Sequence, residues 1–215
     1  MRKAKIAAGK TLLYREPPHY ITLGKELPAK ALDEILTDHA EVFTELKEYY
    51  KQTSESETTK ISFYEDTYSL YNLYRFSHYY EEAYGKYIWL KSGASLVIEH
   101  TEAMTVIDVN TGSVLKKKKQ EDTLFYQINR EAAKEIARQL RLRNISGIIM
   151  IDFINMKDTA QKEKLLSLLD SECKKDRVHC NVIDMTALNL VEMTRSKVRK
   201  PLHEQIRSCM KNNRS

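Results

Sequence analysis

Two aspartates and an asparagine are the residues of this sequence best suited to chemistry. Asp108 and Asn110 lie in "TVIDVNTG" at 105–112, and Asp152 ends the aliphatic run in "GIIMIDF" at 147–153. Both stretches are typical of strands, and side chains alternate along a strand, so Asp108 and Asn110 share one face. Because an unpaired carboxylate is costly in a core, we expect a cation or a strong hydrogen-bond donor nearby.

Each aspartate stands near the carboxyl end of its strand, where ligand crevices tend to open in α/β sheets. If the two strands are neighbours, Asp108, Asp152 and the amide oxygen of Asn110 form a half-shell of the oxygen ligands that Mg²⁺ prefers. A metal held in this way activates a water and stabilises the charge that develops on a phosphodiester. The alternative is that both aspartates only cap the loops that follow them, and spacing alone leaves both interpretations open.

Basic residues are concentrated in the second half of the chain. The formal net charge of +5 is modest, but "KKKK" at 116–119, "RQLRLR" at 138–143 and "RSKVRK" at 195–200 form blocks. Such blocks suit a polyanion such as a nucleic-acid backbone. The candidate phosphate contacts are Lys116, Lys117, Arg138, Arg141, Arg143 and Arg195. Alternatively, the lysines form a loop without a defined site, and the arginines of 138–143 are solvated or paired with Glu131 and Glu135.

Strand and helix patterns alternate from residue 93 onward, which predicts an α/β layer structure. Strands are predicted over 11–16, 19–24, 60–65, 95–100, 103–110, 147–153 and 179–184. Helices are predicted over 28–50, 129–143, 162–175 and 188–198. Asn129 can cap the helix that begins with it. In the last helix Glu192 and Arg195 lie three residues apart, and we favour their pairing with each other over a catalytic role.

The composition also indicates in which cellular compartment the protein is expected. No apolar run reaches the roughly 18 to 20 residues that cross a bilayer, and the first residues lack the apolar stretch of a secretory signal. Cys173, Cys180 and Cys209 are too few for a disulfide framework and too irregularly spaced for a metal knuckle. We therefore expect a cytoplasmic protein in a reducing compartment, with no membrane partner.

Longer motifs carry a family resemblance. "SGASLVIEHTEAMTVIDVNTG", "INREAAKEIARQLRLRNISGIIMIDFINM" and "LVEMTR" together resemble the catalytic region of the ribonuclease E/G family, over roughly Ser92 to Leu202. Upstream, "FSHYYEEAYGKYIWLKSG" and, more weakly, "DEILTDHAEVFTELKEYY" are similar to the segments that precede that region. The resemblance implies an α/β fold in which a truncated ribonuclease H-like subdomain, residues 1–90, is followed by a deoxyribonuclease I-like catalytic subdomain, residues 91–215.

The resemblance also implies an activity and a site. In the family, the aspartates at the positions of Asp108 and Asp152 bind the catalytic Mg²⁺, and the asparagine at the position of Asn110 assists them. The family's activity is endonucleolytic cleavage of single-stranded RNA, leaving a 5′ phosphate, in RNA processing and decay. The resemblance therefore implies a magnesium-dependent endoribonuclease with Asp108, Asn110 and Asp152 as its catalytic residues.

Three departures from the family pattern are visible. Full-length members carry an S1 domain and a sensor for the RNA 5′ monophosphate, whereas only short, unmatching sequence precedes Leu12, so we expect both to be absent. Asn212 stands where the family has the second cysteine of its zinc link, so no zinc-linked oligomer is expected from Cys209 alone. Residues 187–189 replace an arginine, an aromatic and a glycine, which indicates a lost RNA contact.

Two further hypotheses remain beside the enzyme. In the first, the chain is a non-catalytic RNA-binding or partner-binding module derived from the nuclease. In the second, it is a fragment or subunit that a separate S1-containing protein completes. A homodimer is a further option. The retention of two carboxylates and an amide favours the enzyme, because a site without activity has no chemical need for them.

Overall fold

The computed structural model describes residues 18–26, 32–51, 59–112 and 121–212. The chain divides into two compact units, residues 1–77 and residues 78–215. The predicted subdomain boundary at residue 90 stays a prediction. Among the described residues, no helix is both long and apolar enough to cross a bilayer.

Unit 1, residues 1–77, combines short helices with a two-stranded parallel sheet. Its elements are α1 (His19–Glu26), β1 (Glu34–Thr37), α2 (Ala40–Lys51), β2 (Lys60–Phe63) and α3 (Leu70–Leu73), and α4 (Phe76–Tyr84) begins at its end. Strands β1 and β2 pair in register from Glu34 with Lys60 to Thr37 with Phe63. A small core of Ile21, Leu46 and Tyr50 packs against them.

Two predictions for unit 1 are wrong. The segment 19–24 was expected as a strand but lies in α1, because Pro18 starts a helical turn in which its carbonyl accepts from the amides of Ile21 and Thr22. The helix expected over 28–50 is interrupted by β1, and α2 begins only at Ala40. The strand expected at 60–65 is confirmed as β2.

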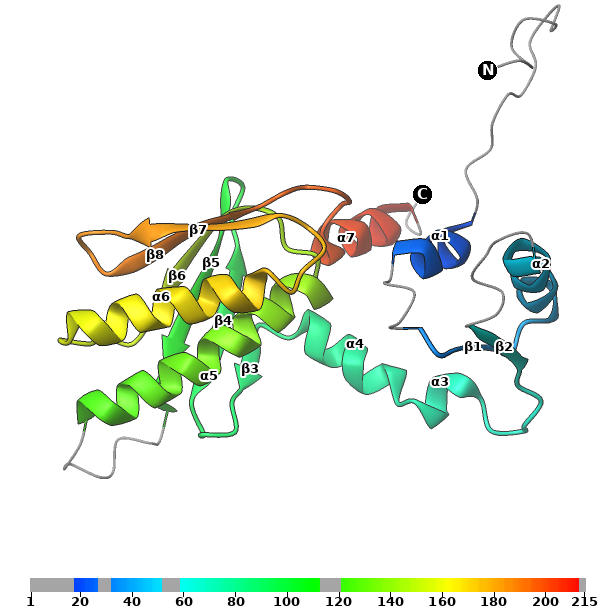
Figure 1. The fold of residues 1–215 in the computed structure, drawn as a ribbon, viewed down its shortest axis with the longest axis horizontal. Coiled ribbons are helices and arrows are strands. Elements are labelled where there is room, and N and C mark those ends of the chain that lie inside the picture. Colours follow the sequence, from blue (N-terminus) through cyan, green and yellow to red (C-terminus); the bar gives the residue numbers. More distant parts are fainter. Residues whose placement is uncertain (1–17, 27–31, 52–58, 113–120, 213–215) are drawn as a thin grey trace, which may run out of the picture. The chain divides into compact units, whose positions relative to one another are not determined.

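Unit 2, residues 78–215, is built on a six-stranded, mostly antiparallel sheet with the order β3-β4-β5-β6-β8-β7 (Figure 1). The strands are β3 (Tyr87–Trp89), β4 (Ser95–His100), β5 (Met104–Asn110), β6 (Gly147–Asp152), β7 (Cys180–Met185) and β8 (Leu190–Arg195). Strands β4 and β5 form the predicted hairpin. Strands β5 and β6 are the parallel pair, and α5 (Glu121–Leu142) lies between them in sequence.

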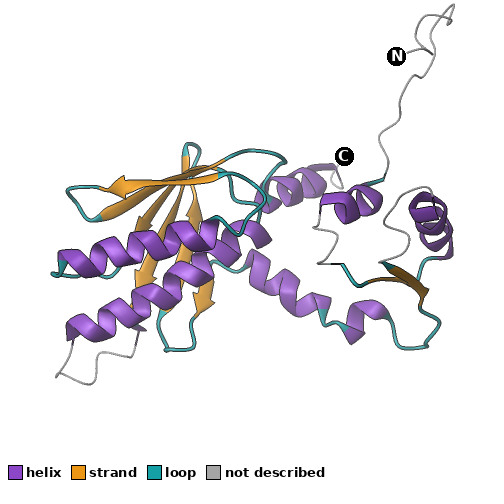
Figure 2. Cartoon of the chain, viewed as in Figure 1, coloured by secondary structure: helices purple, strands orange, loops and turns teal. Residues whose placement is uncertain are grey.

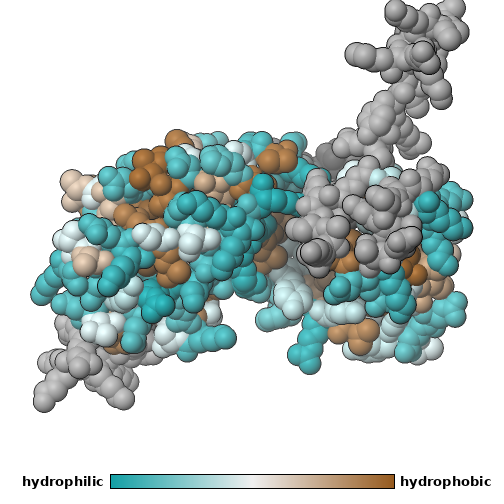
Figure 3. Space-filling view, viewed as in Figure 1, coloured by the Kyte–Doolittle hydropathy of each residue, from teal (hydrophilic) through white to brown (hydrophobic). Residues whose placement is uncertain are grey.

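One face of this sheet is covered by α5 and α6 (Thr159–Cys173), which run side by side (Figure 2). Inward-facing strand residues such as Ile107 and Ile151 meet a helical row of Ile128, Ala132 and Ile136 in one continuous core. The row recurs every four residues, as the sequence predicted. The outward surface of the two helices is mainly hydrophilic (Figure 3), which is the pattern of helices that cover a core from the solvent side.

The other face of the sheet carries the alternate residues of each strand, and we call it the open face. It presents Tyr87 and Trp89 of β3, Val97 and Glu99 of β4, Asp108 and Asn110 of β5, Met150 and Asp152 of β6, and Leu190 and Glu192 of β8. These side chains are exposed or half-buried, whereas their neighbours along the strands are buried. The chemistry-bearing residues therefore lie on the side of the sheet opposite α5 and α6.

The segment expected as a last helix over 188–198 forms β8 instead. Leu190, Glu192 and Thr194 are half-buried while Val191 and Met193 are buried, so the pattern has the period of two that belongs to a strand. Helix α7 (Leu202–Asn212) follows it. Because the strand places Glu192 and Arg195 on opposite faces, the predicted Glu192–Arg195 pair does not form.

Candidate functional site

Two carboxylates meet on the open face of unit 2. In the parallel pair β5–β6, Asp108 and Asp152 are direct Cα partners, so their side chains lie next to each other on the same face. Strands in a sheet are only about 4.8 Å apart. The structure therefore brings together the two aspartates that the sequence singled out, 44 positions apart in the chain.

Asn110 extends this pair along β5. Its Nδ2 donates a 2.6 Å hydrogen bond to Oδ2 of Asp108. The bond orients both side chains and uses the donor end of the amide, so the amide oxygen can serve as a ligand. All three residues predicted as the site are thus contiguous on one surface.

The electrostatics of the pair favour a cation. Burial and, secondly, the charge of Asp108 raise the pKa of Asp152 above its ordinary range. Two like charges on neighbouring strands repel each other, and a positive ion between them removes that cost. Within the described parts of the chain no group of three or more His, Cys, Asp or Glu side chains is placed to hold a metal. The oxygen donors that Asp108, Asp152 and Asn110 offer are two carboxylates and an amide, a set that fits Mg²⁺ because that ion is usually held by one or two carboxylates and waters.

Glycine at position 112 positions the end of β5. Gly112 has φ +57°, and a Cβ atom there would approach the carbonyl oxygen of Gly93 to 2.5 Å. The turn between β3 and β4 therefore packs directly on the backbone that leaves the site, and a side chain at this position would push the two segments apart.

Asn129 positions the end of β6. It was expected as the cap of a helix, but α5 begins at Glu121 and Asn129 lies in its middle, fully buried. Its Nδ2 donates to the carbonyl of Ile154 at 2.7 Å, and its Oδ1 accepts from the amide of Ile154 at 3.0 Å. Because Ile154 is two residues past Asp152, this pair of bonds holds the loop that begins at the site. The available signal in the sequence was the position of Asn129 directly after Ile128, within the apolar residues that recur along this helix.

A sequence profile of the Ribonuclease E/G family matches residues 1–198. The chain belongs to the Ribonuclease E/G family. The resemblance read from the motifs is confirmed, and the match reaches upstream of Ser92 to the first residue.

Relatives in this family have names that agree with one another. The chain is 37% identical over 201 residues to "Ribonuclease G" of Haemophilus influenzae, covering 94% of this chain and 40% of that protein. It is 38% identical over 171 residues to "Ribonuclease G" of Escherichia coli, covering 80% and 35%. It is 31% identical over 206 residues to "Ribonuclease E" of a Nostoc species, covering 94% and 30%. The chain thus spans less than half the length of these Ribonuclease E/G relatives.

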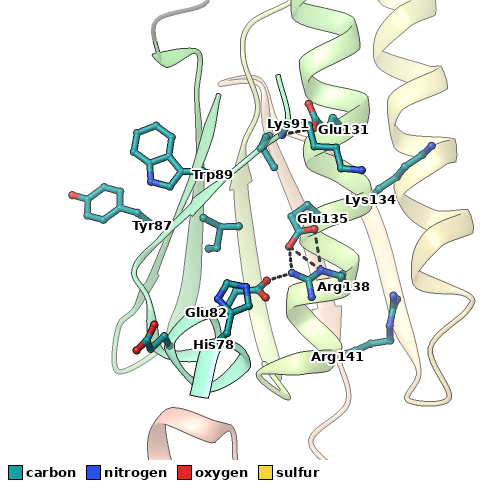
Figure 4. A pocket seen from close by; sticks show the side chains of 13 residues that line it. His78, Glu82, Tyr87, Trp89, Lys91, Glu131, Lys134, Glu135, Arg138 and Arg141 are labelled. Carbon is teal, nitrogen blue, oxygen red and sulfur yellow. Dashed lines mark hydrogen bonds and ion pairs between the residues drawn. The ribbon is translucent and has the colours of Figure 1, made fainter. Parts of the chain in front are cut away.

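The arginines that the sequence predicted as RNA contacts differ in their burial and in their partners. The guanidinium of Arg138 pairs with Glu82, and with Glu135 at 2.9 Å, beside a groove of about 690 Å³ between α4, β3 and α5 (Figure 4). Glu131 was the other expected partner, but it accepts from the backbone amides of Lys91 and Ser92. Of the paired alternatives, the one with Glu135 is the arrangement found.

Arg143 and Arg195 are buried, each with only 4% of its surface exposed. Arg143 donates to Oε1 of Gln139 at 2.7 Å and to the carbonyl of Glu82 at 2.8 Å. Arg195 pairs with Asp176 at 2.9 Å and donates to Asn144 and Ile145. Neither guanidinium can meet a phosphate without breaking these bonds, so the structure gives both an internal role in place of the expected surface one.

The remaining basic candidates are Arg141, Lys116 and Lys117. Arg141 is exposed near the end of α5, and its Nη1 makes a 3.4 Å bond to the carbonyl of Glu172. Lys116 and Lys117 lie outside the described residues. Arg141 is therefore the predicted phosphate contact that is most accessible in the described part of the chain.

Proposed function

We propose that this chain is the catalytic part of a magnesium-dependent endoribonuclease that cleaves single-stranded RNA in RNA processing or decay. Support comes from one observation above all, which is the in-register pair Asp108 and Asp152 with Asn110 bonded to it, in a chain that belongs to the Ribonuclease E/G family. The relatives' printed names, Ribonuclease G and Ribonuclease E, agree with this reaction class.

Asp108 and Asp152 would hold the ion through their carboxylates, and the amide oxygen of Asn110 would assist them. When bound, Mg²⁺ would supply the positive charge that lowers the pKa of a water and offsets charge on the phosphate. The bond from Asn110 keeps the Asp108 carboxylate in one orientation. Asn129 fixes the backbone just after Asp152, so that the carboxylates do not have to be ordered when substrate arrives.

The finer architecture and the partners also belong to the proposal. Residues 1–90 would form a truncated ribonuclease H-like subdomain and residues 91–215 a deoxyribonuclease I-like catalytic subdomain. The partner is single-stranded RNA in the cytoplasm, and no zinc-linked oligomer is proposed. A homodimer or a separate S1-containing protein would supply additional substrate contacts.

The test is cleavage of a 5′-labelled, single-stranded A/U-rich RNA by the purified chain, with Mg²⁺ or with EDTA. Asp108→Asn and Asp152→Asn should each abolish cleavage while leaving the fold intact by circular dichroism. Glu99→Gln is the matched control, because it removes a carboxylate from the same open face that is already paired with Lys86. Cleavage that survives EDTA, or that Asp108→Asn does not reduce, would contradict the metal site.

A second candidate is a non-catalytic RNA-binding or partner-binding module. Magnesium-independent RNA binding without any cleavage in the same assay, also after addition of an S1-containing relative, would support this candidate over the enzyme.

A further inference from the structure

Edge strand β3 exposes two aromatic side chains on the open face. Tyr87 is 59% exposed and Trp89 is 73% exposed, whereas Ile88 between them is buried. Trp89 is also the single tryptophan of the sequence. Large aromatic rings usually bury most of their surface, so two exposed rings on one face of one strand indicate a surface that meets a flat partner.

Strand register connects these rings to the candidate active site. Tyr87 pairs with Val97, which pairs with Asp108, and Trp89 pairs with Ser95, which pairs with Asn110. Directly paired residues point to the same face of a sheet, so the rings and the carboxylates share the open face. With strands about 4.8 Å apart, β3 lies about 10 Å from the strand of Asp108 and about 14 Å from the strand of Asp152.

Tyr87 and Trp89 belong to the strand that borders the charged groove, but their rings do not point toward its charged side chains. Figure 4 shows Tyr87 and Trp89 projecting away from the groove, while Glu135 and Arg138 point into it. The surroundings of the rings are polar, since Glu99 pairs with Lys86 and the Lys86 ammonium lies 5.7 Å from the centre of the Tyr87 ring. A ligand for this surface must therefore offer flat apolar rings together with charged groups.

We propose that Tyr87 and Trp89 form a platform on which bases of single-stranded RNA stack, on the same face as the site of Asp108 and Asp152 at which the phosphodiester would be cleaved. The proposal rests on the proposed function and deepens it by naming the residues that select the substrate. Unpaired bases expose their faces to aromatic side chains, whereas paired bases in a duplex are already stacked. The platform would thus favour single-stranded RNA and set which nucleotide lies beside the cleaved bond.

The single tryptophan makes the contact directly measurable. The wild-type chain is titrated in EDTA, which prevents magnesium-dependent cleavage, with a fluorescein-labelled single-stranded A/U-rich RNA followed by anisotropy. In parallel, tryptophan emission is followed with unlabelled RNA. We expect quenching of Trp89 by the single strand that saturates with the anisotropy, and much weaker quenching by the same sequence annealed as a duplex.

Substitutions separate stacking from general binding. Trp89→Leu should weaken single-strand binding roughly ten-fold, the scale of one stacked base, whereas Trp89→Phe should retain most of the affinity. Tyr84→Leu is the control, because Tyr84 is also an exposed aromatic residue, with 51% of its surface accessible, but lies on α4. With Mg²⁺, Trp89→Leu should also shift the cleavage positions, which a purely structural role of the indole would not do.

The outcomes that overturn the platform differ from those that overturn the enzyme. Unchanged tryptophan emission at saturating RNA, or wild-type affinity in Trp89→Leu, rules out stacking even if cleavage proceeds. Quenching of Trp89 that follows protein concentration without RNA, and disappears in dilute solution, would assign the face to self-association and also reject the proposal. Conversely, specific quenching by single strands without magnesium-dependent cleavage would keep the platform as a binding surface and reject the enzyme.

Discussion

Carboxylates in unit 2 occupy two contrasting settings, the open face of the sheet and the charged groove between α4, β3 and α5. In the groove Glu82 and Glu135 share the guanidinium of Arg138, and Glu131 accepts from two backbone amides. On the open face, Asp108 and Asp152 adjoin each other, and neither forms a salt bridge with the described part of the chain. Charges that stabilise the fold are compensated within the protein, whereas charges left uncompensated are available to bind an external cation.

Asp152→Asn should have the largest effect among the variants that test this contrast. RNA cleavage should fall by roughly three orders of magnitude or more, because a ligand of the ion is lost. The free energy of unfolding, measured with urea, should stay constant or rise, because repulsion from Asp108 and the cost of burying the charge disappear together. A variant that loses stability and retains cleavage would mean that Asp152 belongs with the structural carboxylates.

Arg195→Leu should have the opposite signature. The Arg195–Asp176 pair is almost fully buried, with side chains 3% and 5% exposed, so removing the arginine leaves a buried charge uncompensated. We expect a loss of about 3 to 5 kcal/mol in the free energy of unfolding. The double variant Arg195→Leu with Asp176→Leu should recover part of this loss in urea denaturation. Recovery would fail to appear if Arg195 stabilised the chain through its other bonds alone.

Asn129→Leu tests a residue that combines both roles. The substitution keeps the approximate volume but leaves the amide and carbonyl of Ile154 without partners, which should cost about 1 to 3 kcal/mol of stability. Cleavage should decline under conditions where the variant is still folded, because the loop after Asp152 is no longer held. Gln139, also buried on α5, gives a control as Gln139→Leu, which should lower stability and leave cleavage by the folded fraction unchanged.

A pair of stacked histidines should make the stability of unit 2 depend on pH. His100 of β4 stacks on His203 of α7 with ring centres 3.8 Å apart, near Arg143 and Arg207. Burial first, and then the positive charges of His203, Arg143 and Arg207, lower the pKa of His100 to about 4. The unfolded chain, with an ordinary pKa of about 6.5, binds a proton first on acidification.

The folded state should therefore lose stability as the pH falls from about 6.5 toward 4, and this histidine should add no further loss below that. Urea denaturation across this range measures the effect. His100→Gln should flatten the curve, whereas His78→Gln, on α4, should not. A curve of equal slope in both variants would assign the pH dependence to other groups.

The smallest expected effects are those of substituting Arg138 and Arg141, which compare a paired arginine with an exposed one. Arg141→Gln should weaken RNA binding several-fold and reduce the slope of affinity against salt by about one, as expected for one phosphate contact. Arg138→Gln should change RNA affinity little, and stability by less than about 1 kcal/mol, because its ion pair is partly solvated. Equal effects at both positions would show that the ion pairs of Arg138 do not withhold its guanidinium from RNA.

Local patterns predicted much of the sheet and of the site. Alternation in "SLVIEH" and "MTVIDVN" gave the β4–β5 hairpin and placed Asp108 and Asn110 on one face, as found. The sequence alone could not show that β5 and β6 are adjacent strands. Their order in the sheet depends on how α5 packs across it. The structure supplied that step through the Asp108–Asp152 register.

Errors arose where a residue's partner lies far away in sequence. Asn129 was interpreted as a cap because that is the local use of asparagine, but its partner is Ile154, 25 residues on. Arg195 was matched with the nearby Glu192, whereas its partner Asp176 is brought close by the β7–β8 hairpin. Trp89 was passed over because a three-residue edge strand has too short a pattern to show which face it exposes.

The crossover from β5 through α5 to β6 has a consequence for how this chain could be altered. Both aspartates belong to one β–α–β segment, since a parallel pair requires such a connection. The segment is contiguous from Asp108 to Asp152, so fusions, insertions or circular permutation elsewhere in the chain leave the two carboxylates on the same stretch of polypeptide. The arrangement of the two carboxylates can therefore be transferred to another protein as one continuous segment.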